Sequence, residues 1–197
     1  MLLTAFVLIE LRSANPLVRL GILKSAALRR ANYGAMALLG SWFGFQFIGT
    51  LYMQNLRGWS PIEMALAFLP AGLIVAFGSP NIGRLVNRVG TTIPVGAGLT
   101  SLGLAYLLFW NIGADSSYLS AMLPTFILSG IGFTLAFGPL TIAATSDVSD
   151  EEQGLASGLV YTSFQLGGAI GLAVATAVIE AGTSGSSATA GSAEALL

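Results

Sequence analysis

The sequence predicts an all-α, polytopic membrane protein with five complete transmembrane helices. Hydrophobic residues make up 54% of the chain and charged residues only 9%, which is more apolar than a soluble domain. A helix needs roughly twenty apolar residues to cross the ~30 Å hydrocarbon core. Five stretches without Asp, Glu, Lys or Arg reach that length: residues 31–54, 64–83, 89–114, 116–146 and 154–179. The lipid bilayer is therefore the one partner that composition requires.

The two ends of the sequence flank this five-helix part. Residues 1–11 are apolar but too short to span, and we interpret them as the end of a truncated transmembrane helix. Residues 12–30 are predicted to form a basic loop and residues 31–182 the five helices. Residues 183–197, rich in Gly, Ser and Ala, are expected to be a flexible external connector that leads to a missing last helix. These features predict that the sequence is a piece of a longer protein.

The basic residues predict which loops face the cytoplasm. Short cytoplasmic loops are enriched in Lys and Arg, and successive loops alternate between the two sides of the membrane. The loops at residues 55–63 and around Asp115, with the tail after Gly182, carry only Arg57. The other set, at residues 12–30, 83–90 and 146–153, carries the remaining seven: Arg12, Arg19, Lys24, Arg29, Arg30, Arg84 and Arg88. The second set is therefore predicted to be cytoplasmic, in a multi-pass protein of the plasma membrane.

The residue inventory excludes several functions. The chain has no cysteine and no histidine, so thiol nucleophiles, imidazole bases and Cys/His metal sites are impossible. An intramembrane hydrolase is disfavoured, because the chain has no His or Cys and no Asp or Glu near the centre of a predicted helix. The net charge of −1 gives no basis for a nucleic-acid partner. We predict no catalytic residue and no metal. In "SDVSDEEQG" we expect the carboxylates to favour a helix N-terminus, with Ser149 and Glu152 as a capping box.

The stretch "GRLVNRVG", residues 83–90, has two interpretations. In the simpler one it is a short cytoplasmic turn, in which the arginines anchor the helices and Gly83 and Gly90 permit tight geometry. In the other it is a motif. It resembles the Gly-x-Leu-Ala-Asp-Arg-x-Gly loop of the major facilitator superfamily, with Asn87 where that family has Asp. The resemblance implies a conformational-switch loop, in which Asn87 and Arg88 meet the ends of neighbouring helices.

Other stretches resemble one branch of that superfamily, the fourteen-helix drug:proton antiporters. These are "EMALAFLPAGL" and "GPLTIAATSDVSDEEQGLASGLVYTSFQLGGAIGLAV", and the resemblance covers roughly residues 3 to 182. It implies that the chain is the C-terminal half of a major facilitator superfamily bundle. Its partner would be the missing N-terminal transporter half.

Small residues predict where helices pack closely. Without a hydrophobic drive between helices in lipid, glycines four residues apart let two backbones approach. Three such pairs occur in the sequence: Gly40 and Gly44, Gly154 and Gly158, and Gly167 and Gly171.

Polar and aromatic residues inside the apolar stretches are candidates for a substrate path. Phe43, Gln46 and Thr50 share one helical face, and Tyr161 and Gln165 share another that differs from the Gly167/Gly171 face. Either set could line a cavity for a small hydrophobic or cationic substrate. The alternative is ordinary packing and interhelical hydrogen bonding.

The resemblance implies proton-coupled efflux of small hydrophobic or cationic drugs, powered by the proton gradient without any cofactor. Such coupling needs a carboxylate near the membrane centre, and here the carboxylates fall near predicted helix ends, so we expect the coupling groups in the missing half. The alternative function is a non-transporting membrane module that packs against a partner membrane protein.

Overall fold

The computed structural model describes residue 22, residues 25–113 and residues 116–194, with residues 183–194 described by their backbone alone. The predicted helix end at residues 1–11 lies outside the described residues. The described part is helical and contains no strand.

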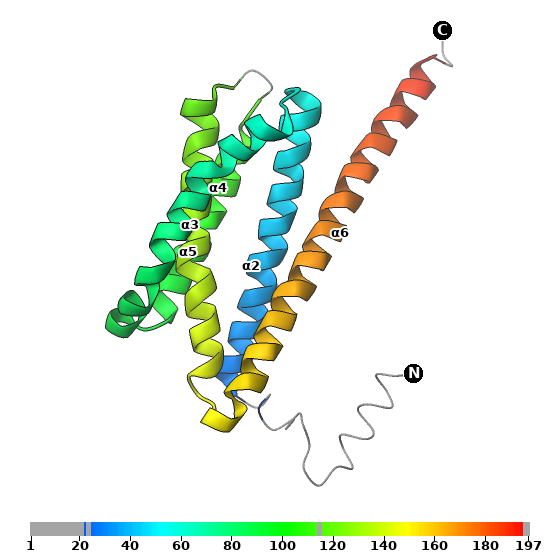
Figure 1. The fold of residues 1–197 in the computed structure, drawn as a ribbon. Helices are drawn as coiled ribbons and strands as arrows, with labels where there is room; N and C mark the ends of the chain where they lie inside the picture. The colour runs from blue at the N-terminus through cyan, green and yellow to red at the C-terminus, as the bar shows by residue number, and fades with distance from the viewer. Residues whose placement is uncertain (1–21, 23–24, 114–115, 195–197) are drawn as a thin grey trace, which may run out of the picture.

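The long helices run up and down beside one another (Figure 1). The elements in order are α2 (Ala26–Leu51), the π-helical turn η2 (Tyr52–Leu56), α3 (Pro61–Val89), α4 (Thr92–Trp110), the π-helical turn η3 (Tyr118–Met122), α5 (Leu123–Thr145), the 3-10 turn η4 (Asp150–Glu152) and α6 (Gln153–Glu194). Five of the helices are long and apolar enough to cross a membrane. The predicted all-α membrane fold is thereby confirmed.

The connections alternate between the two ends of the bundle (Figure 1). The α2–α3 and α4–α5 connections share one end, which we call the Arg57 end. The α3–α4 and α5–α6 connections share the other, which we call the Arg88 end. All the connections are short, so neighbouring helices in the sequence are antiparallel.

Two predicted boundaries differ from the structure. Helix α2 begins at Ala26 rather than at residue 31, because the Ser25 side chain caps it by accepting a hydrogen bond from Leu28 N at 3.2 Å. At the other end α6 stays helical to Glu194, although we expected a flexible connector after residue 182. The candidate membrane span of this helix ends at Gly182.

The prediction of a loop at residues 83–90 is wrong for most of its length. Gly83 to Val89 form the last two turns of α3, because Leu and Arg are good helix formers and only Gly90 stops the helix. Gly90 has a φ of 76°, and its N–H donates to Val86 O at 2.8 Å. Side chains other than that of glycine rarely adopt such a positive φ, so glycine suits this position. Only Gly90 and Thr91 separate α3 from α4.

The predicted capping box at Ser149 and Glu152 does not form, since the Ser149 side chain makes no capping hydrogen bond. Glu152 N donates instead to the backbone oxygen of Ser149 at 2.9 Å, which tightens this turn into a 3-10 helix. A capping box with the same residue types occurs at the start of α3, between Ser60 and Glu63.

Backbone contact at glycines holds α2 against α6. A Cβ atom added at Gly40 would lie 2.8 Å from the Gly167 carbonyl oxygen, and one at Gly171 would overlap the Gly40 carbonyl. Gly44 faces the Gly171 carbonyl in the same way, at 3.4 Å. The prediction of close packing is confirmed for these two pairs. It is wrong for Gly154 and Gly158, because a Cβ at either would meet open space.

Helix α5 lies at the centre and also packs through glycines. A Cβ at Gly132 would lie 2.7 Å from the Gly98 carbonyl oxygen of α4, and one at Gly130 would lie 2.8 Å from the Ala71 carbonyl oxygen of α3. The buried residues of α5 include Phe126, Ser129 and Thr134. Close approach at several positions therefore fixes α3 and α4 around α5.

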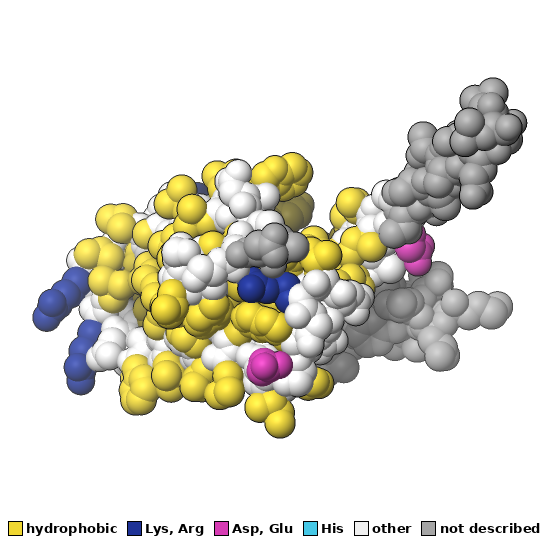
Figure 2. Space-filling view, turned by 90° about the horizontal axis from the view of Figure 1, so that it is seen from above, with side chains coloured by type: hydrophobic (Ala, Val, Ile, Leu, Met, Phe, Trp, Pro, Cys, Tyr) yellow, Lys and Arg dark blue, Asp and Glu magenta, His cyan; other side chains and the backbone are white. Residues whose placement is uncertain are grey.

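The outer surface of the bundle is apolar. Exposed large hydrophobic side chains run along α3, α4 and α6, among them Phe77, Leu107, Trp110 and Val178. Figure 2, which looks down on the Arg57 end, shows hydrophobic side chains around most of the rim and few charged ones. Such a surface suits contact with lipid, and the chain is a multi-pass membrane protein.

Candidate functional site

A groove of about 450 Å³ lies between α3, α5 and α6, toward the Arg88 end. We call it the α3/α5/α6 groove. Helix α5 contributes the most lining residues, and Tyr161 reaches it from the early turns of α6. None of the lining residues is charged. Three of them are aromatic, Phe133, Phe137 and Tyr161, and three carry an aliphatic hydroxyl, Ser79, Thr134 and Thr141.

The aromatic side chains of the groove belong to a continuous row of rings. Phe133 and Phe137 are stacked, with centroids 5.2 Å apart and planes at 14°. Phe137 in turn stacks on buried Phe164 of α6 at 4.7 Å, and Phe164 meets Tyr161 at 6.0 Å. Ring contacts of this kind stabilise beyond their buried area. The row fixes the orientation of the rings that line the groove before any ligand arrives.

The two threonine hydroxyls of the groove each donate a hydrogen bond within α5. Thr134 Oγ1 donates to Gly130 O at 2.8 Å, and Thr141 Oγ1 donates to Phe137 O at 3.2 Å. Because each hydroxyl proton is used within the helix, each oxygen still has a lone pair for an incoming donor. The groove can therefore accept hydrogen bonds from a bound molecule as well as stack against it.

Two glycines shape the wall that α3 contributes. A Cβ at Gly78 would lie 2.8 Å from Thr134 Cγ2, so this glycine lets α3 approach α5 closely. Gly83, one of the residues predicted in the switch loop, lines the groove and has open space beside it. Its missing side chain keeps this part of the groove open.

The structure brings one of the five predicted substrate-path residues into this groove. Tyr161 is 51% exposed and lines it. Gln165, one turn further along α6, is exposed. As predicted, both lie on a different face from Gly167 and Gly171, which are in contact with α2.

The other three candidates lie on α2. Phe43 is 40% exposed and packs against Gly168 of α6, where an added Cβ would lie 2.5 Å from its ring. Gln46 and Thr50 are half-buried. None of these three lines the α3/α5/α6 groove, and their role in a substrate path stays a prediction.

The predicted switch residues lie on the surface at the Arg88 end. Asn87 and Arg88 are exposed in the last turn of α3. Within the described residues, no hydrogen bond joins either side chain to the start of α4 or to another helix. Their role in conformational switching therefore also stays a prediction.

The sequence did not single out Phe133, Phe137, Thr134 and Thr141. A signal was available, since Thr134, Phe137 and Thr141 repeat the i, i+3, i+7 spacing of Phe43, Gln46 and Thr50. Among the described residues, no group of three or more His, Cys, Asp or Glu side chains could hold a metal ion. The arrangement is suited to binding and not to chemistry on a substrate.

The helical bundle with its uncharged groove defines a multi-pass membrane protein. Residues 4–172 match the family described as Major Facilitator Superfamily. The chain belongs to this superfamily.

Curated relatives agree with this assignment. The chain is 32% identical over 176 residues to the multidrug resistance protein Stp of Mycobacterium tuberculosis, covering 89% of this chain and 32% of the relative. It is 36% identical over 171 residues to the lincomycin resistance protein of Streptomyces lincolnensis, covering 86% and 35%. It is 34% identical over 188 residues to the cephamycin export protein CmcT of Amycolatopsis lactamdurans, covering 93% and 38%. The chain thus spans about a third of the length of these relatives.

Proposed function

We propose that the chain forms the C-terminal half of a drug efflux transporter, and that the α3/α5/α6 groove lies on its substrate path. The observation that carries the proposal is the groove itself, where stacked phenyl rings and hydroxyl acceptors surround a space without charge. A planar aromatic compound with a hydrogen-bond donor fits these walls. The names of the relatives, which are resistance and export proteins, support efflux as the direction.

Transport in this proposal needs a second half-bundle. Alternating access moves two sets of helices about a site near the membrane midplane, and the groove would close against the other set. The cytoplasmic side would be the Arg88 end, where Arg29, Arg30, Arg84 and Arg88 lie. The membrane would be the plasma membrane, as expected for export from the cell.

The energy source in this proposal is the proton gradient, with no cofactor. Glu63, Asp147 and the acidic residues of η4 lie close to helix ends. Glu180 lies inside α6 but close to Gly182, where the candidate membrane span of this helix ends, so the described bundle has no carboxylate at mid-depth. A proton-carrying group at the membrane centre would therefore come from the other half.

A chimera tests the proposal. The matching segment of the lincomycin resistance protein is replaced by this chain, and lincomycin resistance is measured in a susceptible host. The expected result is resistance that is lost when the proton gradient is collapsed. A chimera that reaches the membrane at the normal level and gives no resistance would contradict the proposal and favour a non-transporting module.

Variants of the chimera test the path. Phe137→Ala and Tyr161→Ala should change the set of exported compounds, with about tenfold less resistance to an aromatic one, a loss comparable to one ring contact. Trp110→Leu, at a residue that is 88% exposed and does not line the groove, is the control. If Phe43→Ala and Gln46→Ala change the spectrum while the groove variants do not, the path follows α2 instead.

A further inference from the structure

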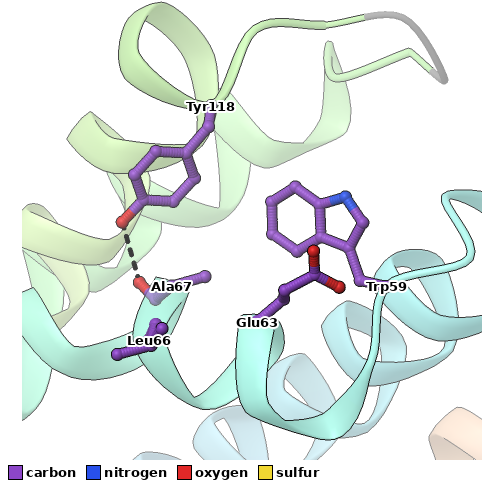
Figure 3. Close-up of a pocket in the computed structure, with 5 residues that line it drawn as sticks. All are labelled: Trp59, Glu63, Leu66, Ala67 and Tyr118. Carbon is purple, nitrogen blue, oxygen red and sulfur yellow. Dashed lines mark hydrogen bonds between the residues drawn. The ribbon is translucent and has the colours of Figure 1, made fainter.

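A second cavity opens at the opposite, Arg57 end of the bundle. Its volume is about 350 Å³, and it is lined by Trp59, Glu63, Leu66, Ala67 and Tyr118. Figure 3 shows the Trp59 indole and the Tyr118 ring facing the same space, with the Glu63 carboxylate beside the indole. Trp59 comes from the connection between η2 and α3, Glu63, Leu66 and Ala67 from the start of α3, and Tyr118 from η3. The cavity shares no lining residue with the α3/α5/α6 groove.

The two aromatic rings are held in place by the fold. Their centroids are 6.2 Å apart and their planes are inclined at 53°. The Tyr118 hydroxyl donates to Ala67 O at 3.0 Å, which ties η3 to α3 (Figure 3). Trp59 N donates to Met53 O at 3.0 Å. Since the rings are already positioned, a ligand in the cavity that contacts both would lose little free energy to ordering the site.

The Glu63 carboxylate is the only charged group in the lining. Its Oε2 atom accepts hydrogen bonds from Ser60 N at 2.8 Å and from Ser60 Oγ at 2.9 Å, in the capping box of α3. Both bonds end on the same oxygen. Within the part of the chain that the structure describes, Oε1 accepts none, so it is available to a ligand.

Arg57 lies next to this cavity without lining it. Its Cζ atom is 5.0 Å from the centroid of the Trp59 ring. Its Nη1 donates to Ser116 O at 2.6 Å and contacts Met122 Sδ at 3.4 Å. The Trp59 ring thus already makes a cation–π contact, for which indole is the best of the aromatic side chains. The positive charge of Arg57 should repel a second cation nearby, so removing this charge should strengthen the binding of a cation in the cavity.

We propose that this cavity binds small organic ammonium ions. A quaternary ammonium group has no N–H to donate, so it is bound by aromatic faces and by a negative charge at a short distance. Trp59 and Tyr118 supply the faces and Glu63 supplies the charge, while Leu66 offers apolar contact to the carbon atoms of the ligand. A metal ion is a poor alternative, because one carboxylate does not replace the hydration shell of Ca²⁺ or Mg²⁺.

A pair of isosteric probes tests this proposal. Choline and 3,3-dimethylbutan-1-ol have the same shape and differ in charge. The full chain is purified in maltoside micelles, which contain no ammonium group, with Trp42→Phe and Trp110→Phe so that Trp59 is the sole indole. Choline should change Trp59 emission with a dissociation constant on the order of millimolar, as expected for weak cation–π contacts. The neutral alcohol should give no saturable change.

Charge variants provide the second readout. Glu63→Gln keeps the capping box, because Gln can replace Glu there, and should weaken choline binding about two- to fivefold, as for an exposed ion pair. Arg57→Gln should strengthen it by a similar factor. Asp150→Asn, which removes one negative charge at the Arg88 end, should change nothing. Equal binding of both probes, or no effect of Glu63→Gln, would overturn the proposal.

The same ammonium group can come from a soluble compound or from a lipid headgroup. Phosphatidylcholine added to the micelles distinguishes the two sources, because a bound headgroup would displace choline from the cavity. Displacement assigns the site to lipid, and its absence assigns it to soluble cations. The transport chimera does not enter this test, so binding can fail while the proposed efflux function stands, or the reverse.

Discussion

The Ser163 hydroxyl of α6 donates a hydrogen bond to Asn32 Oδ1 of α2 at 2.6 Å. Asn32 Nδ2 in turn donates to Leu28 O at 2.8 Å, so both the oxygen and the nitrogen of the side-chain amide are hydrogen-bonded. This polar link lies a few turns below the glycine contact of the same two helices. It gives α2 and α6 a fixed register along their length.

Removing this link should destabilise the bundle modestly. In a double-mutant cycle, Ser163→Ala and Asn32→Leu should show a coupling free energy of about 0.6 kcal/mol, and no more than ~1.7 kcal/mol, as for other interhelical hydrogen bonds in membranes. Unfolding by SDS in mixed micelles measures it. Thr162→Val is the control, because the Thr162 hydroxyl bonds within its own helix to Gly158 O. Additive single effects would contradict the link.

The close contact between Gly40 of α2 and Gly171 of α6 should tolerate substitution far less well. Gly171→Ala forces a methyl group into the Gly40 carbonyl, and we expect a loss of about 1–3 kcal/mol in the free energy of unfolding. Gly158→Ala, on the same helix with open space around it, should not destabilise the chain, because Ala is favoured over Gly inside a helix by about 1 kcal/mol. The same SDS titration compares the two, and equal effects would mean that helix propensity, not contact, decides.

Arg57 should order the α4–α5 connection. Arg57→Met removes the hydrogen bond to Ser116 O, and the amides of residues 116–122 should exchange hydrogen about 5- to 30-fold faster, equivalent to 1–2 kcal/mol. Hydrogen–deuterium exchange read by mass spectrometry gives the rate. Arg84→Met, at an exposed position of the other end, provides the comparison. Unchanged exchange at residues 116–122 would show that η3 is held by Tyr118 alone.

The orientation predicted from the arginines can be measured directly, since the chain has no cysteine of its own. Ser117 and Ser149 are exposed at opposite ends of the bundle. In intact cells, Ser117→Cys should react with a membrane-impermeant maleimide and Ser149→Cys should not. Disruption of the cells should make both react. The reverse pattern would overturn the predicted topology.

Arg88 is predicted to act on conformational exchange and not on binding. In the transport-competent chimera, Arg88→Ala should slow turnover about tenfold with little change in apparent substrate affinity, because the residue lies at the end of α3 and can favour one end state only. Arg84→Ala, one turn earlier on the same helix, serves as the control. Equal loss of affinity and turnover would indicate that Arg88 only orients the helix.

The five spans were predictable because lipid allows few backbone arrangements. Every backbone polar group must be satisfied within the bilayer, so long uncharged stretches can only be helices there. The residues at which the helices begin and end were harder to predict from the sequence. Ser25 caps α2 before the basic residues end, and "GRLVNRVG" continues a helix that charge and glycine content suggested had stopped.

The groove was harder to predict than the helices. Helices that are apolar all round do not reveal which face is buried, and α5 is of this kind. Phe137 and Tyr161 line the same groove because each packs against Phe164. Gly78 and Gly130 let α3 approach α5 and so place the third wall of the groove. Such contacts depend on the shapes of three helices together, whereas the Gly167/Gly171 face could be predicted because small residues four apart indicate contact by themselves.

The pairing of the first and last described helices has a consequence for biosynthesis. Asn32 and Ser163 are 131 positions apart in sequence, and ribosomes add about 5–20 residues per second. Helix α2 therefore enters the membrane on the order of ten seconds before its partner is made. During that interval Gly40 and the Asn32 amide face lipid or another protein. A nascent chain that stalls before α6 would keep this face uncovered, and the quality-control machinery of the membrane could recognise it as unfinished.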